Sequence, residues 1–386
     1  MLNDEYIRLG TKRSAIRDLF EFGVHYEEQH GKGSVLDFSL GNPSAPTPPE
    51  VDAAIVRLSA TEGVHSYTVA AGNSSVRASL AASLNRRFGA GLDPKHLFLT
   101  IGASADLSIT FGALTMPGDE IVLLAPYFPE YDVFVRGVGA VPVVVPMQED
   151  CEPDLDALER LIGPKTAAVV VNSPNNPSGK VYSRDTLVDL AALLSRKSRE
   201  VGHPIYIVSD EPYREIVYDG VEVPWVPSIY ADTVVCYSWS KCLSLPGERI
   251  GYIAINPSAT DAERLIPAVA GAARALGFVC AGSLFQQVVG ELPDLTCDIG
   301  VYRRNRDLLY QGLIKAGYTC ISPEGAFYLL VKSPIGSGEE FSARAKEKGV
   351  LIVPGRSFGA PDWVRIAYCV PFERIERALP IFEQLI

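Results

Sequence analysis

A single lysine, Lys241, stands in the stretch "YSWSKCLSLPGERIGY" (residues 237–252), among serines and ahead of an arginine. The apolar runs on either side of it, "TVVCY" and "IGYIAI", predict buried strands. An ammonium group is strongly hydrated, so a lysine between two buried segments needs a chemical reason. The main chemical use of a desolvated lysine amine is to form a Schiff base with a carbonyl compound.

The usual carbonyl partner of such a lysine is pyridoxal phosphate, which also demands a carboxylate, a phosphate cup and a hold on its ring. The stretch "YIVSDEPYREIVY" puts Asp210 at the C-terminal end of an apolar run, where α/β sheets bind ligands. A carboxylate there can keep the pyridine nitrogen protonated, and Tyr213 could reach the phenolate oxygen of the same ring. The alternative is an ordinary turn or helix cap, which Asp-Glu after a strand also makes.

A candidate phosphate cup follows another strand. The stretch "LTIGASADLSI" predicts a strand, a small-residue turn and then a helix. Backbone amides at a helix N-terminus bind a dianion well, and serine hydroxyls and an arginine add to them. The alternative is that these small residues only allow close packing. The candidate phosphate ligands are Ala103, Ser104, Ser238, Ser240 and Arg249.

Two further post-strand loops could hold the ring. "APYFPEY" (residues 125–131) offers Tyr127 and Phe128 for stacking, although aromatic residues there also suit a plain core. "VNSPNNPSG" carries Asn176, which could donate to the ring oxygen, although the same residues make a good turn. The separate alternatives do not predict that all these features occur together in one chain.

The composition narrows the class of protein. The chain has 386 residues, of which 47% are hydrophobic and 21% charged, and a net charge of −11 argues against nucleic-acid binding. We find no apolar run long enough for a bilayer, no secretory signal at the N-terminus, and no metal-ligand spacing among the five histidines. Seven cysteines without a paired pattern fit a reducing compartment. We therefore expect a cytoplasmic protein without a metal.

The elements that must position these residues alternate along the chain. Continuous apolar runs predict strands that are covered on both faces, as in a mainly parallel sheet. Helical patterns with capping residues lie between them, at residues 154–162 and 183–200. The predicted strands are residues 96–101, 120–125, 140–145, 167–172, 205–210, 233–238 and 250–255.

The last hundred residues change rhythm. A long helical region at residues 302–318 precedes three short strand-like runs, "GAFYLLV", "VLIVPG" and "WVRIAY". This order suits a smaller α+β domain. We expect a large α/β domain at residues 46–285 and a small domain formed by residues 1–45 and 286–386.

Taken together, these motifs resemble those of the class I/II aminotransferase (aspartate aminotransferase) family of fold-type-I pyridoxal-phosphate enzymes. The resemblance spans nearly everything from "SLGNPSAPTPPE" to "WVRIAY", and "SPNNPSG", "VSDEPY" and "SWSKCLSLPGERIGY" are its most specific parts. It implies the fold-type-I transferase fold, with a mainly parallel sheet in the large domain. It also implies transfer of an amino group from an L-amino acid to a 2-oxo acid through an internal aldimine on Lys241.

The resemblance also implies a role for each matching residue. Lys241 would carry the cofactor and move the substrate proton, and Asp210 would pair with the pyridine nitrogen. Tyr213 and Asn176 would bond to the ring hydroxyl. The remaining matches are Ala103, Ser104, Ser238 and Arg249 for the phosphate, Phe128 for ring stacking, Arg365 for the substrate α-carboxylate, Gly41 beside that carboxylate, and Tyr67 for the phosphate of a neighbouring subunit. A homodimer with shared active sites follows from the match of Tyr67.

Some choices stay open at this point. The stacking position holds Phe128 where aspartate-specific members carry tryptophan, which loosens any inference to aspartate. Arg274 lies in the region from which dicarboxylate-specific members bring a second arginine, although an arginine ending an Ala-rich helix is more often solvated. A C–S β-lyase on the same fold begins with the same proton removal. A non-catalytic sensing module of a transcription regulator is a remote alternative, because no basic helix-turn-helix pattern is present.

Overall fold

The computed structural model describes residues 2, 4–11 and 15–386. Within these residues the main sheet has seven strands in the order β2-β8-β7-β6-β5-β3-β4. Strands β3 to β7 are parallel to their neighbours in this set, whereas β8 runs antiparallel to both β2 and β7. The strands are β2 (Leu97–Thr100), β3 (Glu120–Leu124), β4 (Val141–Val145), β5 (Thr166–Asn172), β6 (Tyr206–Asp210), β7 (Thr233–Ser238) and β8 (Gly251–Ile255).

The apolar runs of the sequence therefore form the predicted, mainly parallel sheet. Every residue of β5, β6 and β7 is buried, as expected for strands that are covered on both faces. The edge strand β4 is the exception, since most of its residues are partly exposed. It contains Pro142, and an edge strand tolerates a proline because one side of it needs no ladder hydrogen bonds.

Helices cover both faces of this sheet, and several begin and end with capping residues. The Ser183 side chain accepts a hydrogen bond from the Thr186 amide at the start of α8, and Gly202 ends α8 with a φ of 84°. Asp154 caps α7 in the same way as Ser183 caps α8. The helices are α3 (Pro49–Ser59), α4 (Ser74–Phe88), α5 (Ala103–Leu114), α6 (Glu130–Gly137), α7 (Leu155–Leu161), α8 (Arg184–Val201), α9 (Ala262–Ala275) and α10 (Ser283–Glu291), with short 3-10 turns η1 (Pro94–His96) and η2 (Val226–Ser228).

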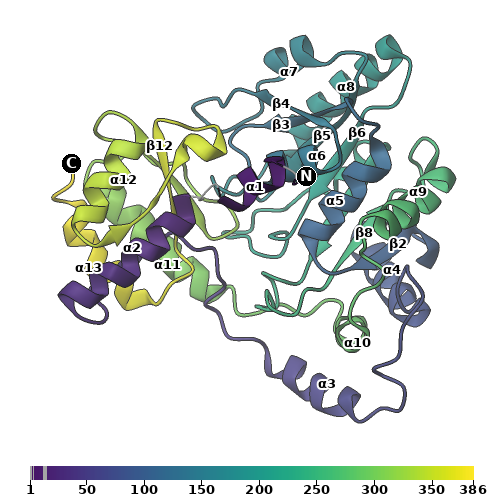
Figure 1. Ribbon diagram of the computed structural model, residues 1–386, viewed down its shortest axis with the longest axis horizontal. Helices are drawn as coiled ribbons and strands as arrows, with labels where there is room; N and C mark the ends of the chain where they lie inside the picture. The colour runs from purple at the N-terminus through teal and green to yellow at the C-terminus, as the bar shows by residue number, and fades with distance from the viewer. Residues whose placement is uncertain (1, 3, 12–14) are drawn as a thin grey trace.

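Two small sheets lie in the left part of Figure 1, away from the seven-stranded sheet. One is antiparallel with the order β11-β12-β9, and the other pairs β1 with β10 in parallel. The strands of these sheets are β1 (Leu36–Asp37), β9 (Tyr328–Lys332), β10 (Val350–Leu351), β11 (Val353–Pro354) and β12 (Trp363–Ala367). The helices α2 (Ala15–His30), α11 (Gly300–Lys315), α12 (Gly338–Glu347) and α13 (Phe372–Phe382) and the 3-10 turn η3 (Gly355–Phe358) lie in the same part of the molecule. Helix α1 (Asp4–Thr11) lies nearer the centre of the view in Figure 1.

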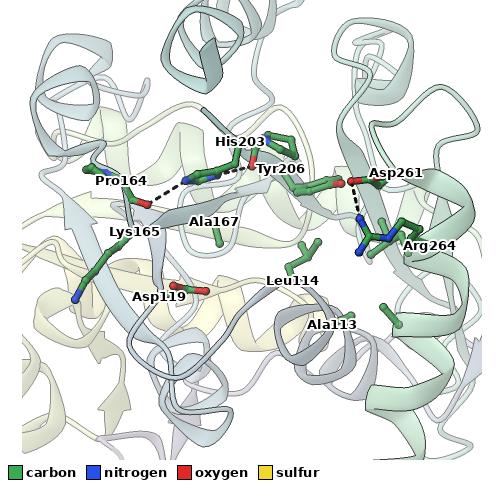
Figure 2. A pocket seen from close by; sticks show the side chains of 13 residues that line it. Ala113, Leu114, Asp119, Pro164, Lys165, Ala167, His203, Tyr206, Asp261 and Arg264 are labelled. Carbon is green, nitrogen blue, oxygen red and sulfur yellow. Dashed lines mark hydrogen bonds and ion pairs between the residues drawn. The ribbon is translucent and has the colours of Figure 1, made fainter. Parts of the chain in front are cut away.

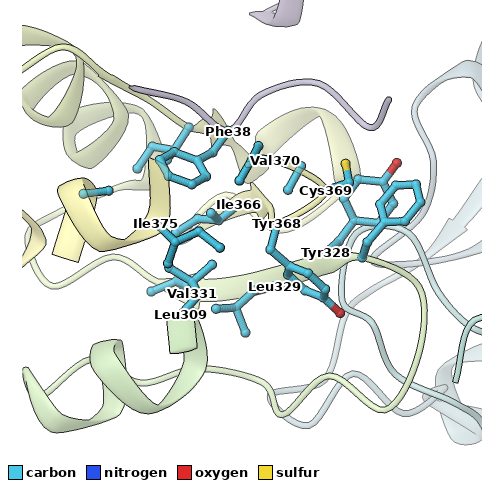
Figure 3. Packing of buried hydrophobic residues seen from close by; sticks show 14 of the residues in the cluster. Phe38, Leu309, Tyr328, Leu329, Val331, Ile366, Tyr368, Cys369, Val370 and Ile375 are labelled. Atoms are coloured by element: carbon cyan, nitrogen blue, oxygen red, sulfur yellow. The ribbon is translucent and has the colours of Figure 1, made fainter. Parts of the chain in front are cut away.

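Both ends of the chain contribute to the hydrophobic core around these small sheets. Figure 3 shows Phe38, from the N-terminal third, packed with Ile366 and Ile375 from the C-terminal end. Cys369 and Tyr328 lie together at one end of the same cluster. Tyr213, which follows β6 of the main sheet, also belongs to this core, so the loop after β6 joins the two parts.

The register of the main sheet brings the polar strand ends together. Asn172, at the end of β5, pairs with Asp210, at the end of β6, and Asp210 pairs with Cys236 on β7. The C-terminal ends of these parallel strands therefore form one edge, where α/β sheets bind ligands. Among the described residues, no helix is both long and apolar enough to cross a membrane, and no cluster of His, Cys, Asp and Glu could hold a metal ion.

Candidate active site

One cavity of about 270 Å³ at this edge brings together all but one of the site residues predicted from the sequence. The exception is Tyr67, which is 94% exposed and lines a different cavity of about 280 Å³ beside α4. The predicted residues that line the first cavity are Gly41, Ala103, Ser104, Phe128, Asn176, Asp210, Tyr213, Ser238, Ser240, Lys241, Arg249 and Arg365.

Lys241 follows β7 in the turn before β8, and its side chain is partly buried. Its Nζ donates a hydrogen bond to the Gly41 carbonyl oxygen at 2.8 Å and lies 5.6 Å from the centre of the Phe327 ring. Burial lowers the pKa of Lys241 to about 8, and the positive charges of Arg365 and Arg249 lower it further. About a tenth of the amine is therefore unprotonated, and hence nucleophilic, at pH 7, far more than for a solvated lysine.

Asp210 is a buried carboxyl that lacks a full set of partners. Tyr131 donates a hydrogen bond to its Oδ2, whereas its Oδ1 is buried with no partner. Burial raises the pKa of Asp210 to about 7, and the negative charge of Glu211 raises it further, against the hydrogen bond from Tyr131. A cationic N–H donor placed at Oδ1 would satisfy this oxygen and favour the carboxylate.

Arg365 is a buried cation that meets no carboxylate among the described residues. It lies on β12 and is only 2% exposed. Its guanidinium donates to Asn176 Oδ1 at 3.1 Å and to the Ser39 carbonyl oxygen at 2.6 Å, while its Nε has no partner. The Tyr328 and Phe358 rings lie 4.7 and 5.0 Å from it. An unpaired buried guanidinium is a receptor for an anion, and its planar fork suits a carboxylate.

Three successive carbonyls of the segment Ser39–Gly41 hold three groups of the site. The Ser39 oxygen accepts from Arg365, the Leu40 oxygen from the Cys369 thiol at 3.5 Å, and the Gly41 oxygen from Lys241. A Cβ atom at Gly41 would lie 1.9 Å from the Tyr328 hydroxyl oxygen, so only glycine fits there. This segment connects Lys241 to Arg365 through the backbone.

The predicted anion cup has the expected backbone. Gly102 precedes α5 with a φ of 100°, and Ala103 and Ser104, the first residues of the helix, line the cavity. Arg249 adopts a φ of 53°, and its guanidinium lies close enough to Gly102 that a Cβ there would be 3.0 Å from Nη2. Ser238 and Ser240 are buried and line the same cavity.

Three further residues support the site and were not found from the sequence: Tyr131, Asn172 and Tyr328. Asn172 donates to the Asp210 carbonyl at 2.9 Å and accepts from the Asn176 amide at 2.8 Å, which joins two predicted residues. The Tyr328 and Tyr213 hydroxyls lie 3.1 Å apart. Two of them could have been found from their positions in the sequence, because Asn172 ends a predicted strand and Tyr131 ends the post-strand stretch "APYFPEY".

Of the two aromatic residues that the sequence suggests for stacking, Phe128 lines the cavity and Tyr127 does not. Phe128 meets the Tyr131 ring edge-on, with centroids 5.6 Å apart and planes at 86°. Arg274, the residue considered for binding an acidic substrate side chain, is exposed in the last turn of α9 and does not line the cavity of its own chain.

A second cavity of about 470 Å³ lies at the opposite edge, near the start of β6, and is lined by His203, Lys165 and Arg264 (Figure 2). Both ring nitrogens of His203 are within hydrogen-bond distance of backbone carbonyls, those of Pro164 and Pro204. Arg264 pairs with Asp261 on the rim at 3.5 Å. The histidine is thus engaged by the backbone, and the groups of this cavity do not converge on a reacting centre.

Comparison with known proteins agrees with the fold. Residues 33–382 match the family described as aminotransferase class I and II, and the chain belongs to this family. Members of this family typically depend on pyridoxal phosphate. The protein is accordingly an aminotransferase, with amino acids and 2-oxo acids as its class of substrates.

Individual relatives cover nearly the whole chain. The chain is similar to the aspartate/prephenate aminotransferase of Thermus thermophilus, with 34% identity over 91% of both chains. An aminotransferase structure from Eubacterium rectale superposes with a TM-score of 0.98 at 49% identity, over 100% of this chain and 98% of that one. The structure of aspartate aminotransferase from Thermus thermophilus with maleate gives a TM-score of 0.86 at 29% identity, over 100% of both chains.

Proposed function

We propose that this aminotransferase binds pyridoxal phosphate in the cavity after β6 and β7 and uses Lys241 to transfer the amino group of an L-amino acid to a 2-oxo acid. The observation that carries the proposal is the pair of unsatisfied buried groups that line one cavity, Asp210 Oδ1 and Arg365 Nε. Buried polar groups without partners are rare, and here they have opposite charges. A pyridine N–H and a substrate carboxylate are the partners they lack.

The other residues of the cavity fit the same cofactor. The α5 amides, Ser104, Ser238 and Arg249 supply donors to a phosphate, and Phe128 offers a ring face. When bound, pyridoxal phosphate supplies an electron-withdrawing ring that lowers the barrier to removing the proton from the substrate α-carbon. Tyr213 keeps its hydroxyl proton, because burial raises its pKa well above the usual value, and so remains a hydrogen-bond donor.

The roles of the chain's own groups in the reaction follow from their environment. Lys241 Nζ holds the cofactor when substrate is absent and accepts or returns the α-proton when substrate is present, which its lowered pKa permits. Arg365 fixes the α-carboxylate, and Asn176, bonded to Arg365, orients that guanidinium. The orientation of the α-carbon bonds then selects proton removal over other cleavages.

The test is a single-turnover absorption measurement with purified holoenzyme and one amino acid at a time. We expect the visible band of the Lys241-linked cofactor to convert to the amino form and to return when a 2-oxo acid is added. Suitable donors include aspartate, glutamate and phenylalanine, and suitable acceptors are 2-oxoglutarate and pyruvate. Lys241→Ala should lose both the band and turnover, and wild-type turnover in that variant would refute the mechanism.

The same experiment addresses the β-lyase alternative. A lyase would return to the starting spectrum without an added 2-oxo acid and would release ammonia and pyruvate from a substrate with a leaving group on its β-carbon. Cystathionine is a suitable probe for this outcome.

The proposal includes a homodimer in the cytoplasm. The exposed Tyr67 lies on a loop that also exposes Val69, and Val279 is exposed in the loop between α9 and α10. Exposed apolar residues of this kind favour coverage by a second copy of the chain, which would carry Tyr67 to the neighbouring phosphate. The seven cysteines are all unpaired, which supports a reducing compartment.

A further inference from the structure

Asp106 is a fully buried carboxyl that the proposed reaction does not use. It lies in the first turn of α5, the helix whose N-terminus forms the anion cup, and is 0% exposed. Thr100, at the end of β2, donates a hydrogen bond to its Oδ1. Its Oδ2 is buried without any partner. A buried carboxyl with one satisfied oxygen is costly to ionise and calls for a functional explanation.

The unsatisfied oxygen lies next to the cup. A Cβ atom built on Gly251, the first residue of β8, would lie 2.9 Å from Asp106 Oδ2 and 2.9 Å from Gly102 Cα. Gly102 in turn packs against the Arg249 guanidinium. The carboxyl, the glycine that opens the cup and the arginine of the cup are therefore close-packed around a position that only glycine can occupy.

The charged and titratable groups that face Asp106 come from several elements. They are Asp210 of β6, Cys236 of β7 and Arg249 before β8, while Tyr131 of α6 is directed at Asp210. Burial raises the pKa of Asp106 well above its usual range, and the negative charge of Asp210 raises it further, while the Thr100 hydrogen bond and Arg249 oppose the shift. Arg249 is the cation that acts on Asp106 within the described chain, and it is the same group that the phosphate needs.

We propose that Asp106 is a positioning residue of the anion cup whose ionisation opposes the binding of a phosphate dianion, so that the chain holds a phosphorylated cofactor less tightly as pH rises. In its neutral form Asp106 joins β2 to α5 through Thr100 and leaves Arg249 free for the phosphate. In its ionised form Asp106 places a negative charge beside the cup that must also hold the negatively charged phosphate. The inference rests on the proposed function, since it requires that the cup bind the phosphate of the cofactor.

The sign of the effect follows from linkage. A bound dianion raises the pKa of a neighbouring carboxyl, so binding is accompanied by proton uptake at Asp106. Affinity therefore falls as pH rises through the raised pKa of Asp106. Replacing the carboxyl with an amide of the same shape removes the titrating proton and leaves the packing nearly unchanged.

The test compares wild-type protein with Asp106→Asn, both free of cofactor, from about pH 7, where a phosphate monoester is already a dianion with its second pKa near 6, up to the highest pH at which both proteins stay folded. The probe is pyridoxine 5'-phosphate, which has no aldehyde and cannot react with Lys241. We expect its Kd for wild-type protein to rise roughly tenfold more across this range than its Kd for Asp106→Asn, as expected for one like charge near the site. Lys241 and Asp210 titrate in both proteins, and comparison with unphosphorylated pyridoxine separates their contribution from that of the phosphate.

Unphosphorylated pyridoxine is the matched control, and its pH dependence should be the same in both proteins. Parallel curves for the phosphate ester in wild-type and Asp106→Asn would overturn the inference while leaving the proposed function intact. If the phosphate group strengthened binding in neither protein, the cup itself would be refuted, and the proposed function with it. If Asp106→Asn does not fold, the Thr100→Val variant tests the inference instead. The Thr100 hydrogen bond lowers the pKa of Asp106, so its loss should shift the fall in affinity to higher pH. An unchanged pH dependence would refute the role of Asp106.

Discussion

The environment of the Lys241 amine lowers its pKa in the cofactor-free protein. Its hydrogen bond to the Gly41 carbonyl does not neutralise its charge, and burial with two nearby arginines disfavours the ammonium form. The side chain can therefore lose its proton more easily than a solvated lysine can. The desolvated amine thus connects the unusual sequence context of Lys241 to a specific reactivity.

The first prediction concerns the rate at which the cofactor-free protein combines with pyridoxal phosphate. Only the unprotonated amine attacks an aldehyde, so the second-order rate constant should rise with pH and level off above about 8, the lowered pKa of Lys241. Stopped-flow absorption measures it. A control reaction with N-acetyl-lysine amide should keep rising to about pH 10.4. A protein profile that follows the free lysine would contradict the prediction.

Asp210 gives the second prediction, which concerns stability without cofactor. Its pKa is about 7 in the folded chain against an ordinary value of 3.8, so the folded state binds the proton more tightly than the unfolded state does. The contribution of the protonated Asp210 carboxyl to the free energy of unfolding is fully present below pH 3.8 and is lost as pH rises to about 7. Asp210→Asn should therefore be more stable than wild type above pH 7, by up to roughly 4 kcal/mol, and equal to it in acid.

Urea unfolding of the cofactor-free proteins at a series of pH values measures this difference. The same variant should bind cofactor weakly and turn over slowly, because the pyridine nitrogen has lost its anionic partner. A constant stability difference between Asp210→Asn and wild type at all pH values would show that Asp210 does not titrate as described.

Sequence reasoning could find Lys241, Asp210 and Arg365 because an ionisable group beside apolar runs is expensive and has few explanations. It could not find Tyr328, since a buried aromatic residue needs no function, and only the position of Tyr131 in a loop after a strand could have indicated that residue. The hydrogen bonds accepted by the carbonyls of Ser39–Gly41 could not be predicted from the sequence for another reason. Every residue has a carbonyl, so its use as an acceptor leaves no mark on the sequence.

At the scale of elements, the strands were predictable and their directions were not. Runs apolar on both faces identified β5, β6 and β7, but nothing in "IGYIAI" shows that β8 runs antiparallel between β2 and β7. The capping residues were better guides to the helices. Ser183 and Gly202 bound α8 within a residue or two of the predicted span.

The third prediction uses one such cap. Gly202 ends α8 at a φ of 84°, and a Cβ added there would meet nothing within 4 Å, so alanine would be strained only by its backbone. Gly202→Ala should cost about 1 kcal/mol of unfolding free energy. Gly163 is the matched control, because it also faces open space but lacks a positive φ. Gly163→Ala should be neutral or stabilising by less than about 1 kcal/mol.

Denaturant unfolding of the holoenzymes measures both changes, and transaminase activity should be unaltered in both, since neither glycine lines the active cavity. Equal losses of stability in the two variants would indicate that the left-handed backbone does not set the cost at Gly202.

At the scale of the whole molecule, we propose the division into residues 46–285 and residues 1–45 with 286–386. The shared core of Figure 3, which joins Phe38 to Ile366 and Ile375, supports the pairing of the two chain ends. Helix α10 crosses the proposed boundary and packs against α3 and α4. That packing would move the C-terminal boundary to the end of α10, a position that limited proteolysis can test.

The last prediction concerns the sharing of active sites between two subunits. If Tyr67 serves the neighbouring phosphate, a Tyr67→Ala protomer has an intact Lys241 but damages the site of its partner. A Lys241→Ala protomer has the reverse defect. A hybrid dimer of the two therefore contains one site with both defects and one site with none.

Mixing the two variants under conditions that exchange subunits should restore about a quarter of wild-type activity, since random exchange makes half of the dimers hybrid and leaves half of their sites intact. Activity is measured at limiting cofactor, where the loss of Tyr67 matters most. The control mixes Lys241→Ala with Asp210→Asn, two defects that line the same cavity of one chain. No site of that hybrid is intact, so the control mixture should gain no activity.

A second arrangement places both defects in one protomer. When Lys241→Ala/Tyr67→Ala is mixed with wild type, the hybrid has its one Lys241 in a site that lacks the neighbouring Tyr67. The cofactor affinity of that site should match the affinity of Tyr67→Ala. The contrary result is wild-type cofactor affinity in this hybrid, together with no gain of activity in the first mixture. Tyr67 would then act within its own chain or have no part in the site, and the prediction of a shared active site would be wrong.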